Sequence, residues 1–223
     1  MDEGLSKNMI IGEMQRAMNV ILIQNRDEEL AQKTMDFFEM NAKNTAIIRE
    51  VKFNYNYERA VIYYNRSDSE KAFQYALQAY SLNPTNFRSE DLLIESFKLA
   101  FKDKEIESIT NKMEELSTTY PQLLKNKSFI SLKANAYLYA MSKSFEEKKA
   151  NLGLNYRSKV EQLIKDHEDL LYDPKLISEA YSNASVYYFK MGYTSKAKGL
   201  LKKGLELAPA DKQLEIRLKM LNY

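Results

Sequence analysis

The sequence predicts an all-α fold built from successive antiparallel helix pairs. Three observations lead to this fold class. Glycine (6) and proline (4) are scarce in a chain of 223 residues, which disfavours an all-β fold with its many turns. Met, Leu, Lys, Glu and Ala, which favour helices, fill much of the remainder. The third observation is an internal repeat, because residues 63–84 are echoed by residues 188–209.

The repeat preserves the residues that shape a helical hairpin. In the later copy, apolar residues recur every three or four positions on both sides of Gly192, as on two helices joined by a tight turn. Pro209 then ends the second helix, because proline lacks an N–H and clashes with the preceding turn. The shared residues are Tyr63, Lys71, Ala72, Leu82 and Pro84 in the first copy and Tyr188, Lys196, Ala197, Leu207 and Pro209 in the second.

The rest of the chain divides into further helices. Residues 1–52 contain about two helices, the second opened by a capping box at Asn25 and Glu28. Residues 53–86 form the first clear repeat, 88–121 a weaker one, and 125–173 a long one with an insertion near 143–156. Residues 175–209 form the last repeat, and Asp211 is the expected N-cap of a closing helix over 211–223. We therefore expect one repeat domain over 1–223.

The two clear units resemble the tetratricopeptide repeat (TPR), a helical hairpin of about 34 residues. The last unit departs from the family at Ala184-Ser185, where Leu-Gly is preferred, and at Gly204, where alanine is usual, and the first unit has Ser67 in place of the turn glycine. The resemblance implies a right-handed α-solenoid of about nine to ten helices. The residues that carry it are Tyr181, Tyr188, Gly192, Ala197, Leu201 and Pro209 in the last unit and Tyr63, Ala72, Ala79 and Pro84 in the first.

The sequence contains no pattern typical of catalysis or metal binding. His167 is the single histidine and cysteine is absent, so neither a thiol zinc site nor a nucleophilic triad can be assembled. No glycine-rich phosphate loop is present. The net charge of +2 argues against a nucleic-acid partner. We therefore expect no enzymatic activity, no cofactor and no metal.

The resemblance also implies which residues contact a partner, since the first helix of each TPR hairpin lines a concave face. Carried over to this chain, that face is rich in aromatic and amide side chains, which suit an interface. The tyrosines at repeat positions, Tyr63, Tyr137, Tyr181 and Tyr188, are expected in the core instead. The expected face comprises Tyr57, Val61, Tyr64, Asn65, Ile94, Lys98, Phe101, Ser131, Asn135, Leu138, Tyr139, Glu179, Ser182, Val186, Phe189 and Lys190.

These residues predict a non-enzymatic scaffold that binds a protein or a peptide on this face. One alternative is a sensory or oligomerisation domain of a larger regulator or membrane-associated protein, and homo-oligomerisation stays open. Another is that the protein's own N-terminal helices fill the groove. The lysine and asparagine clamp that holds a C-terminal carboxylate in some TPR proteins is not supported, because Tyr57 and Val61 occupy two of its positions.

The start of the chain lacks a basic segment and a cleavage site, and its longest apolar run is Val20 to Ile23. We therefore expect neither a signal peptide nor a membrane span in this chain, and a cytoplasmic location.

Overall fold

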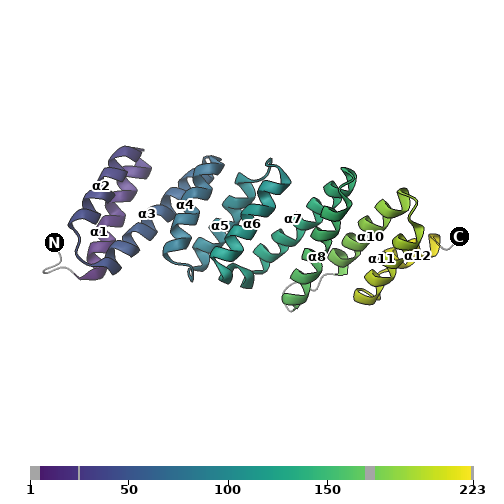
Figure 1. Ribbon diagram of the computed structural model, residues 1–223. Helices are drawn as coiled ribbons and strands as arrows, with labels where there is room; N and C mark the ends of the chain where they lie inside the picture. Colours follow the sequence, from purple (N-terminus) through teal and green to yellow (C-terminus); the bar gives the residue numbers. More distant parts are fainter. Residues whose placement is uncertain (1–5, 25, 169–173, 222–223) are drawn as a thin grey trace. The chain divides into compact units, whose positions relative to one another are not determined.

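The computed structural model describes residues 6–24, 26–168 and 174–221, and every regular element in these ranges is a helix (Figure 1). The described ranges contain eleven α-helices, one short π-helix, one short 3₁₀-helix and no strand. The all-α class with antiparallel helix pairs that the sequence predicts is confirmed for the described residues. The eleven α-helices in the described ranges exceed the nine to ten that the resemblance implies.

The contacts divide the chain into two compact units, residues 1–103 and 104–223. The single domain suggested by the sequence stays a prediction. The first unit contains α1 (Lys7–Asn19), the π-helix η1 (Val20–Gln24), α2 (Glu28–Asn41), α3 (Thr45–Asn65), α4 (Ser69–Leu82) and α5 (Phe87–Ala100). The second contains α6 (Ile106–Thr119), the 3₁₀-helix η2 (Pro121–Lys125), α7 (Lys127–Glu146), α8 (Ala150–Asp166), α10 (Pro174–Lys190), α11 (Thr194–Leu207) and α12 (Lys212–Met220).

Most of the helices begin at a side-chain cap that the sequence supplies. Asp211 caps α12 as predicted, because its carboxylate accepts the backbone N–H of Leu214 at 3.0 Å. At α2 the cap is Asp27, whose carboxylate accepts the N–H of Leu30 at 2.9 Å. Asn25, the cap expected from the sequence, lies outside the described residues.

Three helix pairs share one turn geometry. In α3–α4, α7–α8 and α10–α11 one residue of the turn has a left-handed backbone: Ser67 (φ 59°), Lys148 (φ 61°) and Gly192 (φ 81°). The backbone N–H groups of this residue and the next bond to carbonyls in the last turn of the first helix. We call Ser67, Lys148 and Gly192 the turn residues, and they give a common reference for comparing the pairs.

Counting from the turn residues aligns the long α7–α8 pair with the other two. Tyr137 and Tyr181 each lie eleven residues before their turn residue, so Tyr137 corresponds to Tyr181 and not to Tyr188. Residues 143–156, where the sequence suggests an insertion, form the end of α7, the turn and the start of α8. The additional length relative to both other pairs lies in α8, which has 17 residues where α4 and α11 each have 14.

A small residue five positions after the turn residue lets the helices of each pair approach closely. This residue is Ala72, Gly153 or Ala197, and all three are buried. At Gly153 a Cβ atom would lie 2.5 Å from Cε1 of Phe145, closer than real Cβ atoms come to a neighbour. The α7–α8 packing therefore depends on the absence of a side chain at this position.

The helices of the hairpin expected at 88–121 fall in different units. α5 packs against α4 within the first unit, and α6 packs against α7 within the second. Helix α5 is therefore a neighbour of the α3–α4 pair, and helix α6 is a neighbour of the α7–α8 pair.

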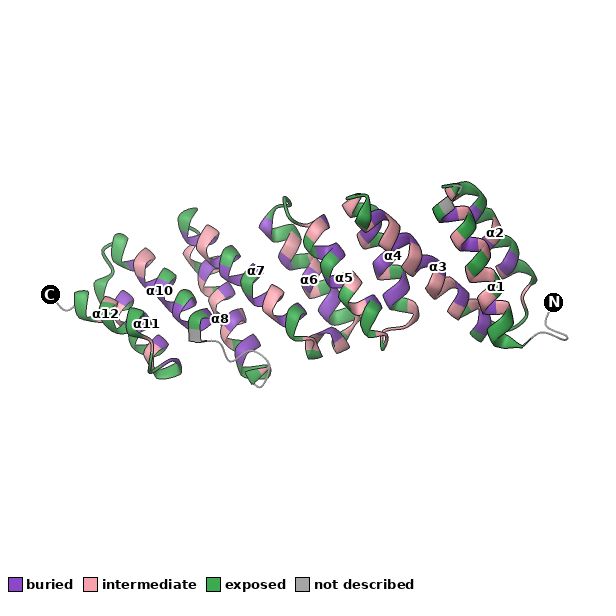
Figure 2. Cartoon of the chain, turned by 180° about the vertical axis from the view of Figure 1, so that it is seen from behind, coloured by how far each residue is buried: buried purple, intermediate pink, exposed green. Residues whose placement is uncertain are grey.

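The tyrosines expected in the core are buried, which confirms that prediction. The exposed fractions of Tyr63, Tyr137, Tyr181 and Tyr188 are 3%, 2%, 0% and 5%. Figure 2 shows buried and exposed residues interleaved along the helices, as expected for amphipathic helices.

In the first unit, the N-terminal helices pack against α3. Their shared apolar core contains Met18 of α1, Met35 and Phe38 of α2, and Ile47 and Val51 of α3. The N-terminal helices thus have their own packing partner in this unit.

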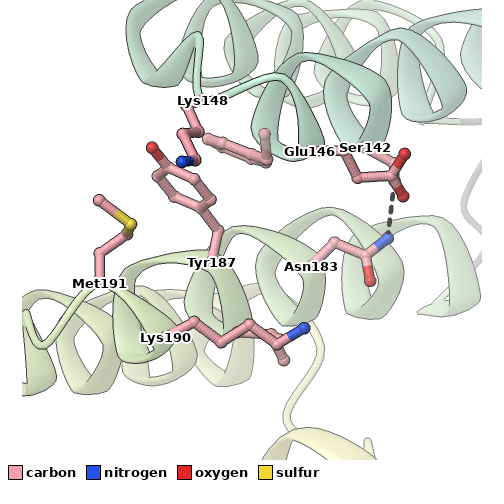
Figure 3. A pocket seen from close by; sticks show the side chains of 9 residues that line it. Ser142, Glu146, Lys148, Asn183, Tyr187, Lys190 and Met191 are labelled. Carbon is pink, nitrogen blue, oxygen red and sulfur yellow. Dashed lines mark hydrogen bonds between the residues drawn. The ribbon is translucent and has the colours of Figure 1, made fainter.

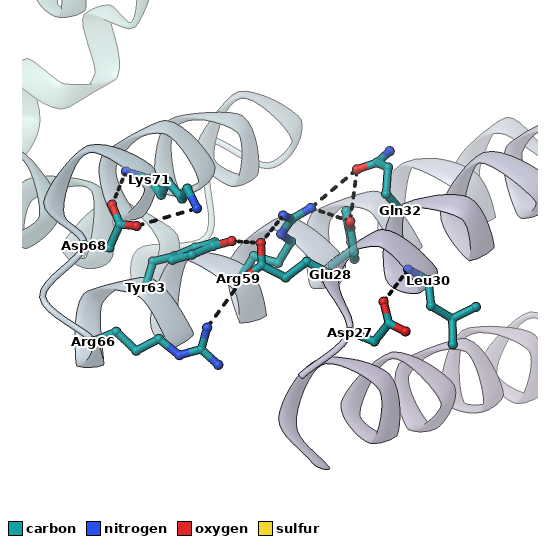
Figure 4. Close-up of polar contacts among 10 residues, drawn as sticks. Asp27, Glu28, Leu30, Gln32, Arg59, Tyr63, Arg66, Asp68 and Lys71 are labelled. Atoms are coloured by element: carbon teal, nitrogen blue, oxygen red, sulfur yellow. Dashed lines mark hydrogen bonds and ion pairs between the residues drawn. The ribbon is translucent and has the colours of Figure 1, made fainter. Parts of the chain in front are cut away.

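A buried arginine links α2 to α3 (Figure 4). The Arg59 guanidinium donates to the Tyr55 hydroxyl at 2.6 Å and reaches Gln32 and Glu28 of α2, each at 3.4 Å. The Tyr63 hydroxyl donates to the same Glu28 carboxylate. Burial opposes the charge on Arg59, but the bond with Tyr63 and the nearby phenols outweigh it and raise its pKa. The cation is therefore compensated inside the fold and serves structure.

Candidate functional site

A hollow of about 360 Å³ lies between α7 and α10, the first helices of two successive pairs in the second unit (Figure 3). We call it the α7–α10 hollow. It lies at the turn ends of both helices. Its lining consists of Ser142, Phe145, Glu146, Lys148, Asn183, Val186, Tyr187, Lys190 and Met191.

Two aromatic rings form the apolar part of the α7–α10 hollow. Phe145 of α7 stacks on Tyr187 of α10 with ring centroids 4.9 Å apart and planes inclined by 24°. Tyr188 contacts Phe145 edge-on at 6.3 Å. The close approach of Gly153 places the backbone of α8 directly behind the Phe145 ring. The Phe145 ring is therefore held from two sides, and together with Tyr187 it offers an apolar contact surface.

A hydrogen bond joins the two helices across the hollow. The Asn183 side-chain N–H donates to the Ser142 hydroxyl oxygen at 3.1 Å. The Asn183 amide oxygen remains an acceptor, and its second N–H remains a donor. An exposed amide of this kind can bind both polar groups of a peptide backbone.

Three charged side chains at the rim are exposed: Lys148, Lys190 and Glu146. None of them forms an ion pair within the part of the chain that the structure describes. Two positive charges and one negative charge are thus free to interact with a ligand.

A second hollow in the same unit, of about 540 Å³, lies among α8, α10 and α11. Three of its polar groups bind one another: the Tyr181 hydroxyl donates to Glu161, and the Lys203 ammonium lies 3.5 Å from the same carboxylate. Its lining also contains Lys165, Glu168 and Glu206, but Tyr181 is its single aromatic residue, and the stacked aromatic pair makes the α7–α10 hollow the stronger candidate.

Another charged group in this unit is satisfied internally. Lys133, 5% exposed, donates to Glu114 at 3.0 Å and to the Ser117 hydroxyl at 2.8 Å. Tyr137 and Lys159 also donate to Glu114. Burial works against ionisation of this carboxyl, but the bonds from Tyr137, Lys159 and Lys133 outweigh it and lower the pKa of Glu114 to about 2. Lys133 and Glu114 are thus bonded within the fold, and these bonds stabilise the packing of α6 against α7.

Two of the residues predicted for the concave face, Val186 and Lys190, line the α7–α10 hollow. Several others in the second unit lie at the surface outside it. These are Ser131, which is half-buried, and Asn135, Tyr139, Glu179 and Phe189, which are exposed.

The predicted residues of the first unit are partly accessible. Tyr57, Val61 and Tyr64 are half-buried, and Asn65 is exposed. Their contact with a partner stays a prediction.

Two further first-unit candidates, Lys98 and Phe101, have partners within the fold. Lys98 is exposed but pairs with Glu95 at 2.6 Å. Phe101 stacks on Phe97 with ring centroids 4.4 Å apart.

Three predicted residues are corrected by the structure. Ile94, Leu138 and Ser182 are 2%, 5% and 4% exposed, so they cannot present a side chain to a partner in this conformation. The first two are apolar, and burying them stabilises the helix packing. The resemblance to the TPR family predicts that these positions are accessible, but neighbouring helices cover them here.

Sequence reasoning missed most of the hollow. The sequence suggests that Tyr137 corresponds to Tyr188. Counting from the turn residues shifts the alignment of the long hairpin by seven residues from that match. One signal was present in the sequence: an aromatic residue stands three positions before each turn residue, as Tyr64, Phe145 and Phe189. The missed residues are Ser142, Phe145, Glu146, Lys148, Asn183, Tyr187 and Met191.

Within the described ranges, no group of three or more His, Cys, Asp or Glu residues could hold a metal ion. None of the helices described is both long and apolar enough to span a membrane.

No protein-family model and no curated protein matches this sequence. Among solved structures, the crystal structure of TTC0263, a thermophilic TPR protein of Thermus thermophilus, is similar at 16% identity. The match covers 95% of this chain and 98% of that chain, with a TM-score of 0.32.

Proposed function

We propose that this chain is a TPR-like scaffold that binds a protein or peptide segment in the α7–α10 hollow. One observation carries the proposal: a stacked aromatic pair, an exposed amide and unpaired charges converge in one place. A few polar groups around an apolar surface are typical of binding sites. If the chain is a member of the TPR family, the first helices of its pairs form the binding side, and α7 and α10 are such helices.

Binding suits the lining better than catalysis. The hydroxyl oxygen of Ser142 accepts a hydrogen bond from the Asn183 amide at 3.1 Å, and the lining residues include no histidine that could act as its base. The charged groups are exposed at the rim, where they can orient a partner.

Selection from a random peptide library on the immobilised full chain tests this proposal. Enriched peptides are then measured by fluorescence anisotropy against variants of the hollow. Tyr187→Ala removes half of the aromatic pair, and we expect affinity to fall roughly tenfold or more, as for an aromatic anchor of an interface. Met191→Ser alters a residue that is 48% exposed, so it tests the hollow with little effect on folding.

The matched control is Phe37→Ala, which removes an aromatic side chain that is 58% exposed on α2 of the first unit. This variant should bind the enriched peptides as the unchanged chain does. The proposal is wrong if no peptide is enriched, or if the enriched peptides bind all three variants equally well.

A further inference from the structure

The charges at the α7–α10 hollow distinguish among partners. Lys148 follows the end of α7 and Lys190 ends α10, and both are exposed without an ion pair in the described residues. Figure 3 shows the Lys148 ammonium beside the Tyr187 ring and the Lys190 side chain extending toward Asn183. A ligand in the hollow therefore meets one ammonium near the ring and another on the Asn183 side. Opposite charges are favoured there by Coulomb attraction, which salt weakens at an exposed rim.

The apolar part of the hollow has the size and geometry for one large side chain. Its volume of about 360 Å³ is at the small end of the range for ligand pockets. Phe145 and Tyr187 present ring faces and edges, and a further aromatic ring gains from offset or edge-on contact with them. Val186 and Met191 complete the apolar lining.

Glu146 restricts how the partner lies. It is exposed on α7 and has no cationic partner in the described part of the chain. An acidic residue facing it would be repelled, and such repulsion contributes to specificity. Acidic residues of the partner are thus favoured near Lys148 and Lys190 and disfavoured near Glu146.

Building on the function proposed above, we infer that the partner is an acidic–aromatic peptide segment. Its aromatic side chain inserts against Phe145 and Tyr187, and flanking carboxylates pair with Lys148 and Lys190. The Asn183 amide holds the backbone of the segment. Nucleic acid fits the hollow less well, because phosphate backbones are held by many cations along a track, and this hollow offers two.

Three synthetic peptides, blocked at both ends so that no terminal carboxylate contributes, test the inference on the full chain. Their cores are Asp-Phe-Asp, Lys-Phe-Lys and Asp-Ser-Asp in one otherwise neutral sequence. We expect the first to bind, and the other two to bind roughly tenfold more weakly or not at all. The binding of the first peptide should weaken as salt is raised.

The double variant Lys148→Glu, Lys190→Glu should lose roughly tenfold or more in affinity for the Asp-Phe-Asp peptide and gain affinity for the Lys-Phe-Lys peptide. The control is Lys198→Glu, Lys202→Glu on α11, which makes the same change in net charge. Neither of those lysines lines the hollow. The control should bind as the unchanged chain does.

The library selection separates failure of this inference from failure of the proposed function. If enriched peptides depend on Tyr187 but carry no excess of acidic residues, the acidic–aromatic partner is wrong and the scaffold stands. If no peptide depends on the hollow, both are wrong. Displacement of the Asp-Phe-Asp peptide by a single-stranded oligonucleotide at low micromolar concentration would also overturn the inference in favour of nucleic acid.

Discussion

The Tyr137 hydroxyl of α7 donates a hydrogen bond to the Glu114 carboxylate of α6. The same tyrosine–carboxylate hydrogen bond recurs at the next helix pair, where the Tyr181 hydroxyl of α10 donates to Glu161 of α8. Both tyrosines lie eleven residues before a turn residue. In the second unit, the first helix of a pair is thus fastened to the helix before it by a buried phenol and a carboxylate.

Glu114→Gln should make the fold less sensitive to acid. The pKa of Glu114 is about 2 in the folded protein against an ordinary value of 4.5. A carboxyl whose pKa is lowered by folding stabilises the fold above its ordinary pKa, and this stabilisation is lost as the pH falls toward the folded value. Because the side chain is 40% exposed, solvent screens part of the effect, and we expect it to contribute roughly 1–2 kcal/mol.

Urea denaturation at about pH 5 and about pH 2 measures this effect. The unchanged chain should lose roughly 1–2 kcal/mol more between these conditions than Glu114→Gln does. Glu115→Gln is the control, because Glu115 is 60% exposed and pairs only with Lys112 on its own helix. An equal acid sensitivity for all three proteins would contradict the prediction.

Gly153→Ala should destabilise the second unit and reshape the α7–α10 hollow. The added methyl group meets the Phe145 ring at 2.5 Å, so the ring or helix α8 must shift, at a cost of about 1–3 kcal/mol. Gly199→Ala is the matched control, because nothing lies within 4 Å of its added Cβ. On a helix this change should stabilise by about 0.5–1 kcal/mol. Thermal denaturation measures the change in stability of both variants. A change in the same direction for the two would refute the packing role of Gly153.

Gly192→Ala should cost about 1–2 kcal/mol, because its φ of 81° is one that residues with a Cβ adopt at a penalty. Nothing lies within 4 Å of the added Cβ, so the loss reports the backbone alone. At the equivalent turn, the native Ser67 adopts φ 59° although it carries a Cβ. Ser67→Gly should therefore change stability by less than about 1 kcal/mol. Guanidinium denaturation of both variants measures the difference, and a neutral Gly192→Ala would be the contrary result.

Arg59→Lys should destabilise the first unit by roughly 1–3 kcal/mol. The guanidinium reaches Tyr55, Gln32 and Glu28 together, and an ammonium cannot match that planar arrangement. Arg88→Lys on α5 is the control, because Arg88 is exposed. Hydrogen exchange of the α2 and α3 amides should increase in Arg59→Lys alone. Unchanged protection of these amides would mean that the apolar core alone holds α2 in place.

Much of the fold could be predicted from the sequence because helices leave local signals. The caps, the prolines after α4 and α11, and the small residues Ala72 and Ala197 are readable without knowledge of tertiary contacts. The α7–α8 pair was harder, since its turn residue is Lys148 and no local signal distinguishes a lysine with a left-handed backbone from any other lysine.

Prediction of the site residues depended on the same alignment of the α7–α8 pair. An alignment of α7 on Tyr137 assigns Phe145 and Glu146 to an insertion and not to the binding side. Burial of Leu138 and Ser182 was also beyond the sequence, because it results from neighbouring helices and not from the residues themselves. An aromatic residue stands three positions before each turn residue, but at Phe145 this spacing can be counted only once the turn at Lys148 is known.

The alignment on turns also locates where this protein can change length. α7 has 20 residues and α10 has 17, and counted back from their turn residues the difference falls at their N-terminal ends. The hollow lies at the opposite ends, next to Lys148 and Met191. Growth or trimming of a first helix at its start would thus leave the α7–α10 hollow untouched, so a lineage or a designer could vary the length of these helices while keeping the residues that line it.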